Sequence, residues 1–461
     1  MIGFIVLALI GLYSLGSALG RSNFSETHIS FSFLNFPVFI GEILMGVCIV
    51  LWVVQYWRQG TVLTKWHKIF LIYWNLILLK ALWDFWIWGP LAFRHAALFY
   101  YPIFVFIGYC FYKKEYFSGW FINGMILPMV FLVSKFTHID YFLYSGFALA
   151  IVLIMHVRTL MWKALFIGIL LVFGHFSELF GQSRTNLIGT LTGLTFLGTI
   201  FITHFLKFSC KVKGLIGFSV LLTVLMGAAF FADRSAILSC LKVGNLYQNY
   251  SNAVSYIDQK RKFYTQQPLV AAIYHGNKDK SQWDLATQVE GEHGYSDPIQ
   301  SFDPIGSKAR LFSAGQNNAV FRLIIWRDMV KELIENKSLL GVGFGKPQRS
   351  SSLEILGWGV GEWCRDGWVT PHNGYIHMIY RLGIIGVLLI MAMMSVVIYM
   401  TKIFIRLRSK DGIILVSVFI YWMMASNFLV ILELPHYAIP FWTLFGMVWA
   451  YGHALTQRNV G

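Results

Sequence analysis

The chain has 461 residues, of which 57% are hydrophobic, 17% aromatic and only 13% charged, and its formal net charge is +15. A soluble globular domain carries roughly 25% charged residues, so this composition excludes an ordinary soluble protein. Apolar runs of about 18 or more residues, each long enough to cross a bilayer, recur from one end of the chain to the other. The sequence therefore predicts an all-α polytopic membrane protein.

We predict about twelve membrane spans. They lie near residues 2–20, 38–57, 69–88, 96–112, 119–134, 140–156, 161–176, 187–206, 213–232, 376–400, 412–431 and 436–455. Alternate connections together with the C-terminal tail hold about fifteen Lys and Arg residues, whereas the short connections on the other side hold about four. The positive-inside rule then makes both termini cytoplasmic and accounts for most of the net charge without a nucleic-acid partner.

One connection is long enough to form a domain, and it lies on the outer side. We expect membrane helices 1–9 in residues 1–232, a large helical loop on the outer side in residues 233–375 and membrane helices 10–12 in residues 376–461. Cys240 and Cys364 share this loop. They form a disulfide or remain two free thiols, and the sequence leaves both possibilities open because it does not give their separation.

Two earlier positions in the chain carry charges in unusual places. Lys80 and Asp84 lie inside a predicted span, four residues apart, and are expected to pair on one helix face. Arg184 opens a span on the outer side, against the charge trend, at a helix start whose free backbone N–H groups attract anions. The sequence thus indicates a phosphate-binding arginine at 184, and an interfacial anchor is the alternative.

The large loop contains an amphipathic helix, predicted over 320–336. Its solvated side is expected to carry five charged residues: Arg327, Asp328, Lys331, Glu332 and Glu335. Arg322 instead points with Ile325, Trp326, Met329 and Leu333. A guanidinium on an apolar face is costly unless it is paired or binds an anion, so Arg322 is a second candidate for anion binding. A structural ion pair, or an arginine that reaches from the apolar face to water, is the alternative.

The glycine-rich segment 341–345 follows this helix and not a strand, so a helix stop and turn is favoured over a nucleotide loop. His275, His293 and nearby acidic residues lack metal-ligand spacing, and no metal or other cofactor is predicted.

His372 lies where the polar loop gives way to an apolar run, which places a titratable group at a membrane surface. Gly383 and Gly386 follow eleven and fourteen residues later. On a continuous helix at 100° per residue they would share the face of His372. The pattern favours a proton acceptor near a lipid-borne substrate, with a helix cap as the structural alternative.

The segment 372–386 resembles the signature of the O-antigen ligase family. It begins with His372-Asn373, and Gly383 follows after nine residues and Gly386 after two more. Arg322 with Trp326, followed by Gly341 and Gly343, resembles the family's Arg-x-x-x-Trp and Gly-x-Gly segment. Many members have Asn-Pro shortly before that Gly-x-Gly, and here the chain reads Asn336-Lys337. Ser183-Arg184 is similar to the family's Ser-Arg at the outer start of a span.

The resemblance implies a C-type membrane glycosyltransferase of the bacterial inner membrane with a periplasmic active site. It would move a glycan from undecaprenyl diphosphate to lipid A–core, with inversion and without a metal. Arg184 and Arg322 would hold the diphosphate, and His372 would be the general base. Asn373, Tyr375, Gly383 and Gly386 would contribute to binding the substrate or lipid.

The alternatives are an O-antigen or exopolysaccharide polymerase that uses the same donor, a protein O-oligosaccharyltransferase, and a polysaccharide transporter or flippase. A single long outer loop favours the ligase over the polymerase, which often has two. A transporter is disfavoured because charged residues inside the predicted spans are few apart from Lys80 and Asp84.

Overall fold

The structure is a computed structural model that describes residues 2–19, 28–31, 36–59, 65–111, 144–145, 148, 151–152, 184–205, 243–266, 314–348, 350–355, 371–429 and 431–458. The chain forms two compact units. The first, here called the membrane unit, comprises residues 1–238, 339–346 and 372–461. The second, here called the loop unit, comprises residues 239–338 and 347–371. Residues 339–346 are part of the long connection in the sequence, but in the structure they belong to the membrane unit.

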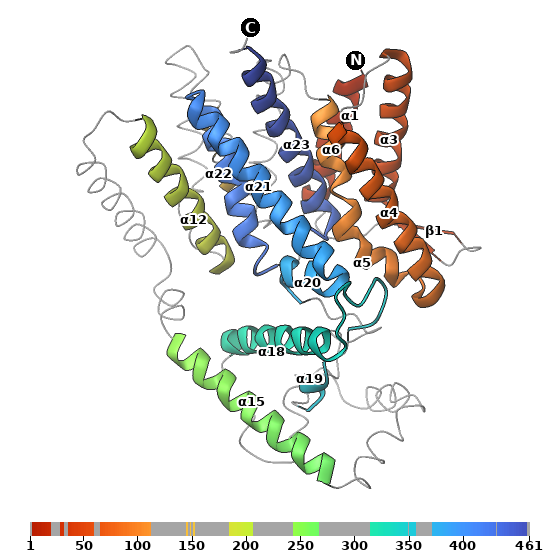
Figure 1. Ribbon diagram of the computed structural model, residues 1–461, viewed down its shortest axis with the longest axis vertical. Coiled ribbons are helices and arrows are strands. Elements are labelled where there is room, and N and C mark those ends of the chain that lie inside the picture. Colours follow the sequence, from red (N-terminus) through yellow and green to blue (C-terminus); the bar gives the residue numbers. More distant parts are fainter. Residues whose placement is uncertain are drawn as a thin grey trace. The chain divides into compact units, whose positions relative to one another are not determined.

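The membrane unit is built from helices that run along one another (Figure 1). Its elements before the long connection are α1 (Ile2–Leu19), β1 (His28–Phe31), β2 (Phe36–Phe39), α3 (Ile40–Gln59), α4 (Lys65–Trp88), α5 (Leu91–Tyr100), α6 (Ile103–Phe111), α12 (Arg184–Ile200) and a π-helix (Phe201–Phe205). Its later elements are α20 (Gly374–Leu382), α21 (Ile384–Arg406), α22 (Lys410–Ala425) and α23 (Pro435–Arg458).

Four helices of the described residues are long and apolar enough to cross a membrane. They are Ile40–Arg58, Lys68–Trp88, Ile188–Phe205 and Ile384–Arg406. The bent pair Leu91–Tyr100 and Ile103–Phe111 makes a fifth if it is one span. Several predicted spans lie outside the described residues: 119–134, most of 140–156, 161–176 and 213–232. The total of about twelve therefore stays a prediction.

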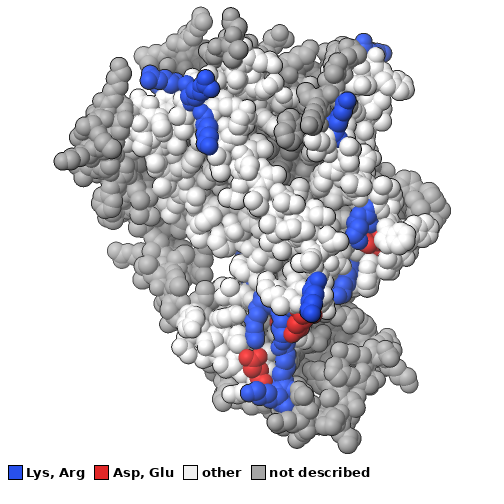
Figure 2. Space-filling view, viewed as in Figure 1, with Lys and Arg blue, Asp and Glu red and all other residues white. Residues whose placement is uncertain are grey.

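The surface of these helices suits lipid. On α4, Trp83 is 68% exposed and Trp86 is 85% exposed. Figure 2 shows Lys and Arg in a few separate groups on an otherwise largely uncharged described surface. Exposed aromatic and aliphatic side chains are expected where the neighbour is a bilayer.

Two details of the membrane unit differ from the sequence prediction. Strands β1 and β2 pair antiparallel, with His28 opposite Phe39 and Phe31 opposite Phe36, although the sequence analysis predicted only helices. The predicted span 96–112 is two helices, α5 and α6, separated by a turn at Tyr101 and Pro102. Proline lacks a backbone N–H and clashes with the preceding turn, so it interrupts a helix at this point.

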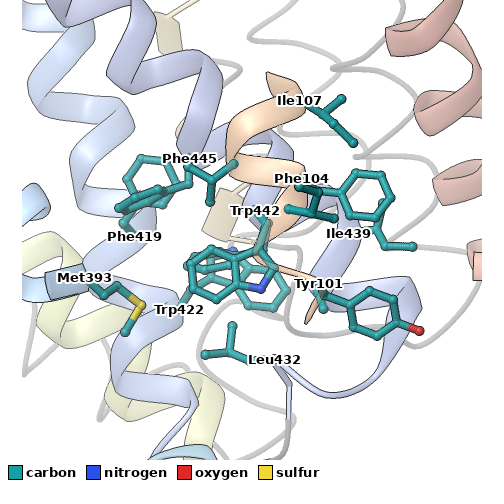
Figure 3. Close-up of a cluster of buried hydrophobic side chains, with 14 of the residues drawn as sticks. Tyr101, Phe104, Ile107, Met393, Phe419, Trp422, Leu432, Ile439, Trp442 and Phe445 are labelled. Carbon is teal, nitrogen blue, oxygen red and sulfur yellow. The ribbon is translucent and has the colours of Figure 1, made fainter. Parts of the chain in front are cut away.

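The core lies where α6, α21, α22 and α23 meet. Trp422, Phe419, Trp442 and Phe445 pack there with Phe104 of α6 (Figure 3). Phe419 meets Phe445 edge-to-face with ring centroids 4.9 Å apart. Glycines let α6 and α23 approach closely, because a side chain at Gly108 would run into the Thr443 carbonyl and one at Gly446 into the Val105 carbonyl. Small residues at a helix crossing are the usual means of close packing in membranes.

The loop unit contains α15 (Val243–Gln266), α18 (Ala314–Glu335) and the short α19 (Ser351–Ile355). The predicted apolar face of α18 is confirmed for Ile325 and Met329, which are buried. Cys240 and Cys364 lie outside the described residues, so their disulfide stays a prediction.

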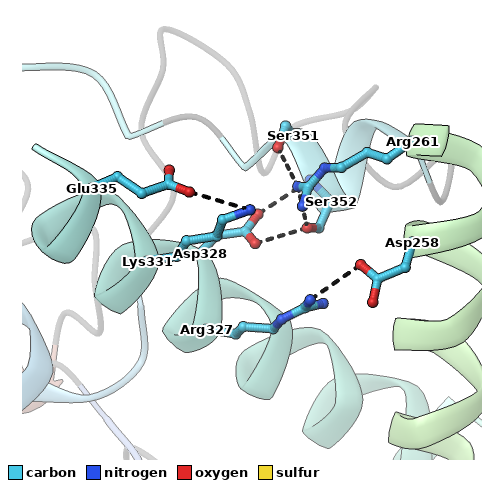
Figure 4. A network of polar contacts seen from close by, with 8 residues as sticks. All are labelled: Asp258, Arg261, Arg327, Asp328, Lys331, Glu335, Ser351 and Ser352. Atoms are coloured by element: carbon cyan, nitrogen blue, oxygen red, sulfur yellow. Dashed lines mark hydrogen bonds and ion pairs between the residues drawn. The ribbon is translucent and has the colours of Figure 1, made fainter. Parts of the chain in front are cut away.

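The predicted solvated face of α18 is wrong for Asp328 and Arg327 (Figure 4). The Asp328 carboxylate accepts hydrogen bonds from Ser350 Oγ at 2.6 Å, from Ser352 Oγ at 2.7 Å and from the Ser352 backbone N–H at 3.1 Å. Arg327 pairs with Asp258 of α15 at 3.2 Å. Periodicity marks these residues as facing away from the apolar side of α18, and it does not show that other segments of the loop unit pack there.

Candidate active site at the start of α20

His372 stands immediately before a capped helix. Asn373 is the N-cap of α20, and its side-chain oxygen accepts hydrogen bonds from the backbone N–H groups of Tyr375 at 3.0 Å and Ile376 at 2.9 Å. An Asn at this position satisfies donors that a helix start otherwise leaves without partners. His372 therefore lies outside the helix, although the sequence analysis placed it on a helix face. The capping role belongs to Asn373.

The backbone of His372 is in the left-handed region, with a φ of 49°. Left-handed backbone is uncommon for residues other than glycine and costs of order 1–3 kcal/mol when the surroundings impose it. The side chain is half-buried. A strained, partly accessible histidine at a helix entrance is the kind of outlier from which a functional role is reasonably inferred.

The expectation that one continuous helix carries His372, Gly383 and Gly386 on a single face is wrong. α20 ends at Leu382 and α21 begins at Ile384, because Gly383 adopts φ 54° and ψ −124°, a conformation that only glycine takes readily. A side chain at Gly383 would collide with the Leu339 carbonyl, and one at Gly386 with the Met378 carbonyl. The two signature glycines thus have packing roles in this structure, and their contact with substrate stays a prediction.

The segment 339–346, here called the ribbon, packs against this helix break as a series of turns and bends. Every backbone N–H from Val342 to Gly345 has a partner: Val342 donates to Tyr380 O, Gly343 to Arg381 O, Phe344 to Asp84 Oδ2 and Gly345 to His95 Nδ1. The glycines at 341, 343 and 345 all have positive φ between 74° and 81°. This explains the alternating glycines, which the sequence analysis took for a simple helix stop and turn.

The predicted pairing of Lys80 with Asp84 is confirmed, with Nζ 2.6 Å from Oδ2. The Asp84 carboxylate has a second contact, because the same Oδ2 atom accepts a hydrogen bond from the Phe344 backbone N–H at 2.8 Å. The pair therefore stabilises the ribbon 339–346 from within α4.

A buried charge network that the sequence analysis missed lies beside the ribbon. Arg381 is 0% exposed. Its guanidinium donates to His377 Nε2 at 3.0 Å and to the Lys346 carbonyl at 2.9 Å, and it contacts His95 Nε2 at 3.0 Å. Arginine's fixed fork of donors suits a site in which several acceptors converge.

The anion of this network is Glu433, which is 1% exposed and lies 3.2 Å from His377 Nδ1. Because His377 Nε2 accepts a hydrogen bond from Arg381, the ring proton lies on the other nitrogen, Nδ1, which faces Glu433. Burial raises the pKa of the Glu433 carboxyl, and the neighbouring His377, Arg94 and Arg381 outweigh that effect, so the pKa is lowered overall. Removing one member of such a buried group costs about 3–5 kcal/mol, because a charge is left without its partner.

Tyr375 is likewise committed to packing. Its hydroxyl donates to the Met423 carbonyl of α22 at 2.8 Å. The signature residues 372, 373, 375, 383 and 386 are thus brought together around α20 in the membrane unit.

The other two predicted site residues lie elsewhere in the chain. Arg322 is in the loop unit, half-buried on α18, one turn before Trp326. The Trp326 indole N–H donates to the carbonyl of Pro371 at 2.6 Å. Arg184 begins α12, as predicted, but its side chain lies outside the described residues.

A comparison with protein families identifies the central part of the chain. The model of the O-antigen ligase family matches residues 178–391. This region is an O-antigen ligase family domain. No curated protein matches it.

The O-antigen ligase match encloses all seven predicted site residues, from Arg184 to Gly386. It also encloses His377 and Arg381, whereas their partners His95 and Glu433 lie outside it. At family level, the match supports a membrane glycosyltransferase of the ligase and polymerase type.

Proposed function

We propose that this chain transfers O-antigen glycan from undecaprenyl diphosphate to lipid A–core. The reaction would take place at the periplasmic face of the bacterial inner membrane. The observation that carries the proposal is His372, a half-buried histidine with strained backbone at the start of the family signature.

In the proposed reaction, His372 takes the proton of an acceptor sugar hydroxyl as that oxygen attacks the anomeric carbon of the donor. The bond between the anomeric carbon and the diphosphate oxygen breaks, and the undecaprenyl diphosphate leaves with the bonding electrons. Attack from the opposite side inverts the anomeric configuration. A neutral imidazole suits this step because its ordinary pKa lies near neutral pH.

The charge that develops on the departing diphosphate needs cations. We propose that Arg184 and Arg322 supply them without a metal ion, because a guanidinium binds two phosphate oxygens at once through its planar fork. The half-buried position of Arg322 supports this, since partial burial strengthens an interaction with an anion.

Asn373, Tyr375, Gly383 and Gly386 complete the proposed binding surface. Asn373 and Tyr375 lie on the first turn of α20, next to His372. Gly383 and Gly386 would act through packing, because the carbonyls of Leu339 and Met378 occupy the space beside them and so close the helix break that follows the site.

The proposal is tested in a strain that lacks the gene and is complemented with this chain or its variants, by resolving lipopolysaccharide on a gel. Polymer-bearing lipid A–core is expected with the parent chain and with His453→Ala, a histidine whose ring lies at the far end of α23. Bare core with accumulated lipid-linked polymer is expected with His372→Ala. A core capped by a single repeat in the deletion strain would instead identify a polymerase, and an absence of lipid-linked glycan from the periplasmic face of the inner membrane would identify a transporter.

A further inference from the structure

The helix that follows His372 is too short to orient itself. α20 has nine residues, and helices shorter than about 12–15 residues are marginal without tertiary contacts. The position of His372 therefore depends on what α20 touches.

The first half of α20 is tied to α22 and to the turn that follows it. The Gly374 backbone N–H donates to the Ser426 carbonyl at 2.8 Å, and the Tyr375 hydroxyl donates to the Met423 carbonyl. One turn later, His377 Nδ1 faces Glu433 at 3.2 Å. Glu433 lies in the turn between α22 and α23.

The second half of α20 is held by Arg381, whose contacts to Lys346, Gly343 and His95 come from the ribbon and from α5. His377 joins the two halves, since its ring accepts a hydrogen bond from the cation Arg381 and faces the anion Glu433. Arg381 and Glu433 are both fully buried, and neither charge tolerates the loss of its bridge.

We propose that Glu433, His377 and Arg381 are positioning residues for His372: they fix α20 against the α22–α23 turn and so hold the base in place. The inference rests on the proposed role of His372 as the base. It assigns to His377 a bridge between two buried charges and no contact with substrate.

A disulfide reports the position of α20 without reference to activity. A Cβ atom built on Gly374 would lie 3.9 Å from the Ser426 Cβ, within the range of about 3.5–4.5 Å found in disulfides. Gly374→Cys and Ser426→Cys are introduced into the full chain after the five native cysteines are replaced by serine. The rate of cross-linking under mild oxidation is then measured by mass.

The parent pair should cross-link readily, and adding His377→Asn should slow the reaction by about fivefold or more, because Asn offers no acceptor where Nε2 meets Arg381. His453→Asn, a matched histidine on α23, should leave the rate unchanged. Glu433→Gln, which keeps the size and shape of the side chain, is a second variant that tests the same network if His377→Asn fails to fold. Equal cross-linking rates in the parent and in a folded network variant would overturn the proposal.

Transfer kinetics provide the second readout. In the His377→Asn background, kcat should fall while KM for the lipid-linked donor stays the same, and oxidation of the 374–426 pair should restore kcat toward that of the oxidised parent pair. A tether that forms but leaves kcat low would contradict positioning. A parent chain without any transfer would refute the proposed function, and the cross-linking rates would still decide the role of the network.

Discussion

Gly383→Ala gives the sharpest test of whether the signature glycines act through packing. Alanine at this position must either adopt the φ of 54° and ψ of −124° or reshape the helix break. The backbone strain costs about 1–3 kcal/mol. The new methyl group also displaces the Leu339 carbonyl, which accepts the Ile384 N–H at 2.9 Å, and losing that hydrogen bond adds about 1 kcal/mol. The expected destabilisation is about 2–4 kcal/mol.

The matched control is Gly46→Ala on α3, where a Cβ atom meets nothing within 4 Å. There alanine should be neutral or slightly stabilising, because it loses less conformational freedom than glycine in a helix. Thermal unfolding of both purified variants in one detergent measures the difference, and Gly383→Ala should melt several degrees lower. If the two variants melt together and Gly383→Ala has lost only donor binding, Gly383 acts on the substrate and the packing explanation is refuted.

Three further outcomes follow from the site. Arg322→Lys keeps the charge but loses the bidentate fork, so the transfer rate should fall at least tenfold. The control Arg327→Lys, on the same helix, should stay active. Full activity of Arg322→Lys beside an inactive Arg322→Ala would show that a point charge suffices. The pKa of Glu433 is lowered in the folded chain, so its contribution to stability is full above the ordinary glutamate range and is lost as pH falls through the lowered value. Glu433→Gln should therefore be less stable than the parent at pH 7, and its Tm should fall less than that of the parent when the pH is lowered. An equal fall of Tm with pH in the two proteins would contradict this prediction. Chelator treatment should leave transfer unchanged, and a loss reversed by a divalent ion would disprove the metal-free mechanism.

The spacing of residues along the sequence was enough to predict contacts within a single helix. Lys80 and Asp84 are one helical turn apart, so their pairing follows from the helix alone. The burial of Ile325 and Met329 follows in the same way from the period of α18. The start of α12 at Arg184 also matches the predicted opening of a span.

The rest of the site depends on contacts between distant parts of the chain. Arg381 meets His95, which is 286 positions away, and Glu433, the anion of the network, comes from a turn after another helix. The sequence analysis gave Arg381 no role. The available signal was the spacing of His377 and Arg381, four residues apart in an apolar run, which marks an intramembrane polar pair.

The helix break at Gly383 shows a second limit of sequence reasoning. An apolar run that continues through a glycine is compatible with one long helix, and only the approach of the Leu339 carbonyl makes the break necessary. The nine-residue α20 that results is what separates His372 from the long helix α21.

A single-turnover assay shows whether His372 removes the proton of the acceptor hydroxyl. Purified chain, lipid-diphosphate-linked glycan and lipid A–core acceptor are mixed across a range of pH. We expect the parent and His453→Ala to transfer glycan, with a rate that rises as an imidazole loses its proton near neutral pH. We expect His372→Ala to bind the donor without transferring it. Transfer by His372→Ala at a rate near that of the parent would show that His372 is not the base.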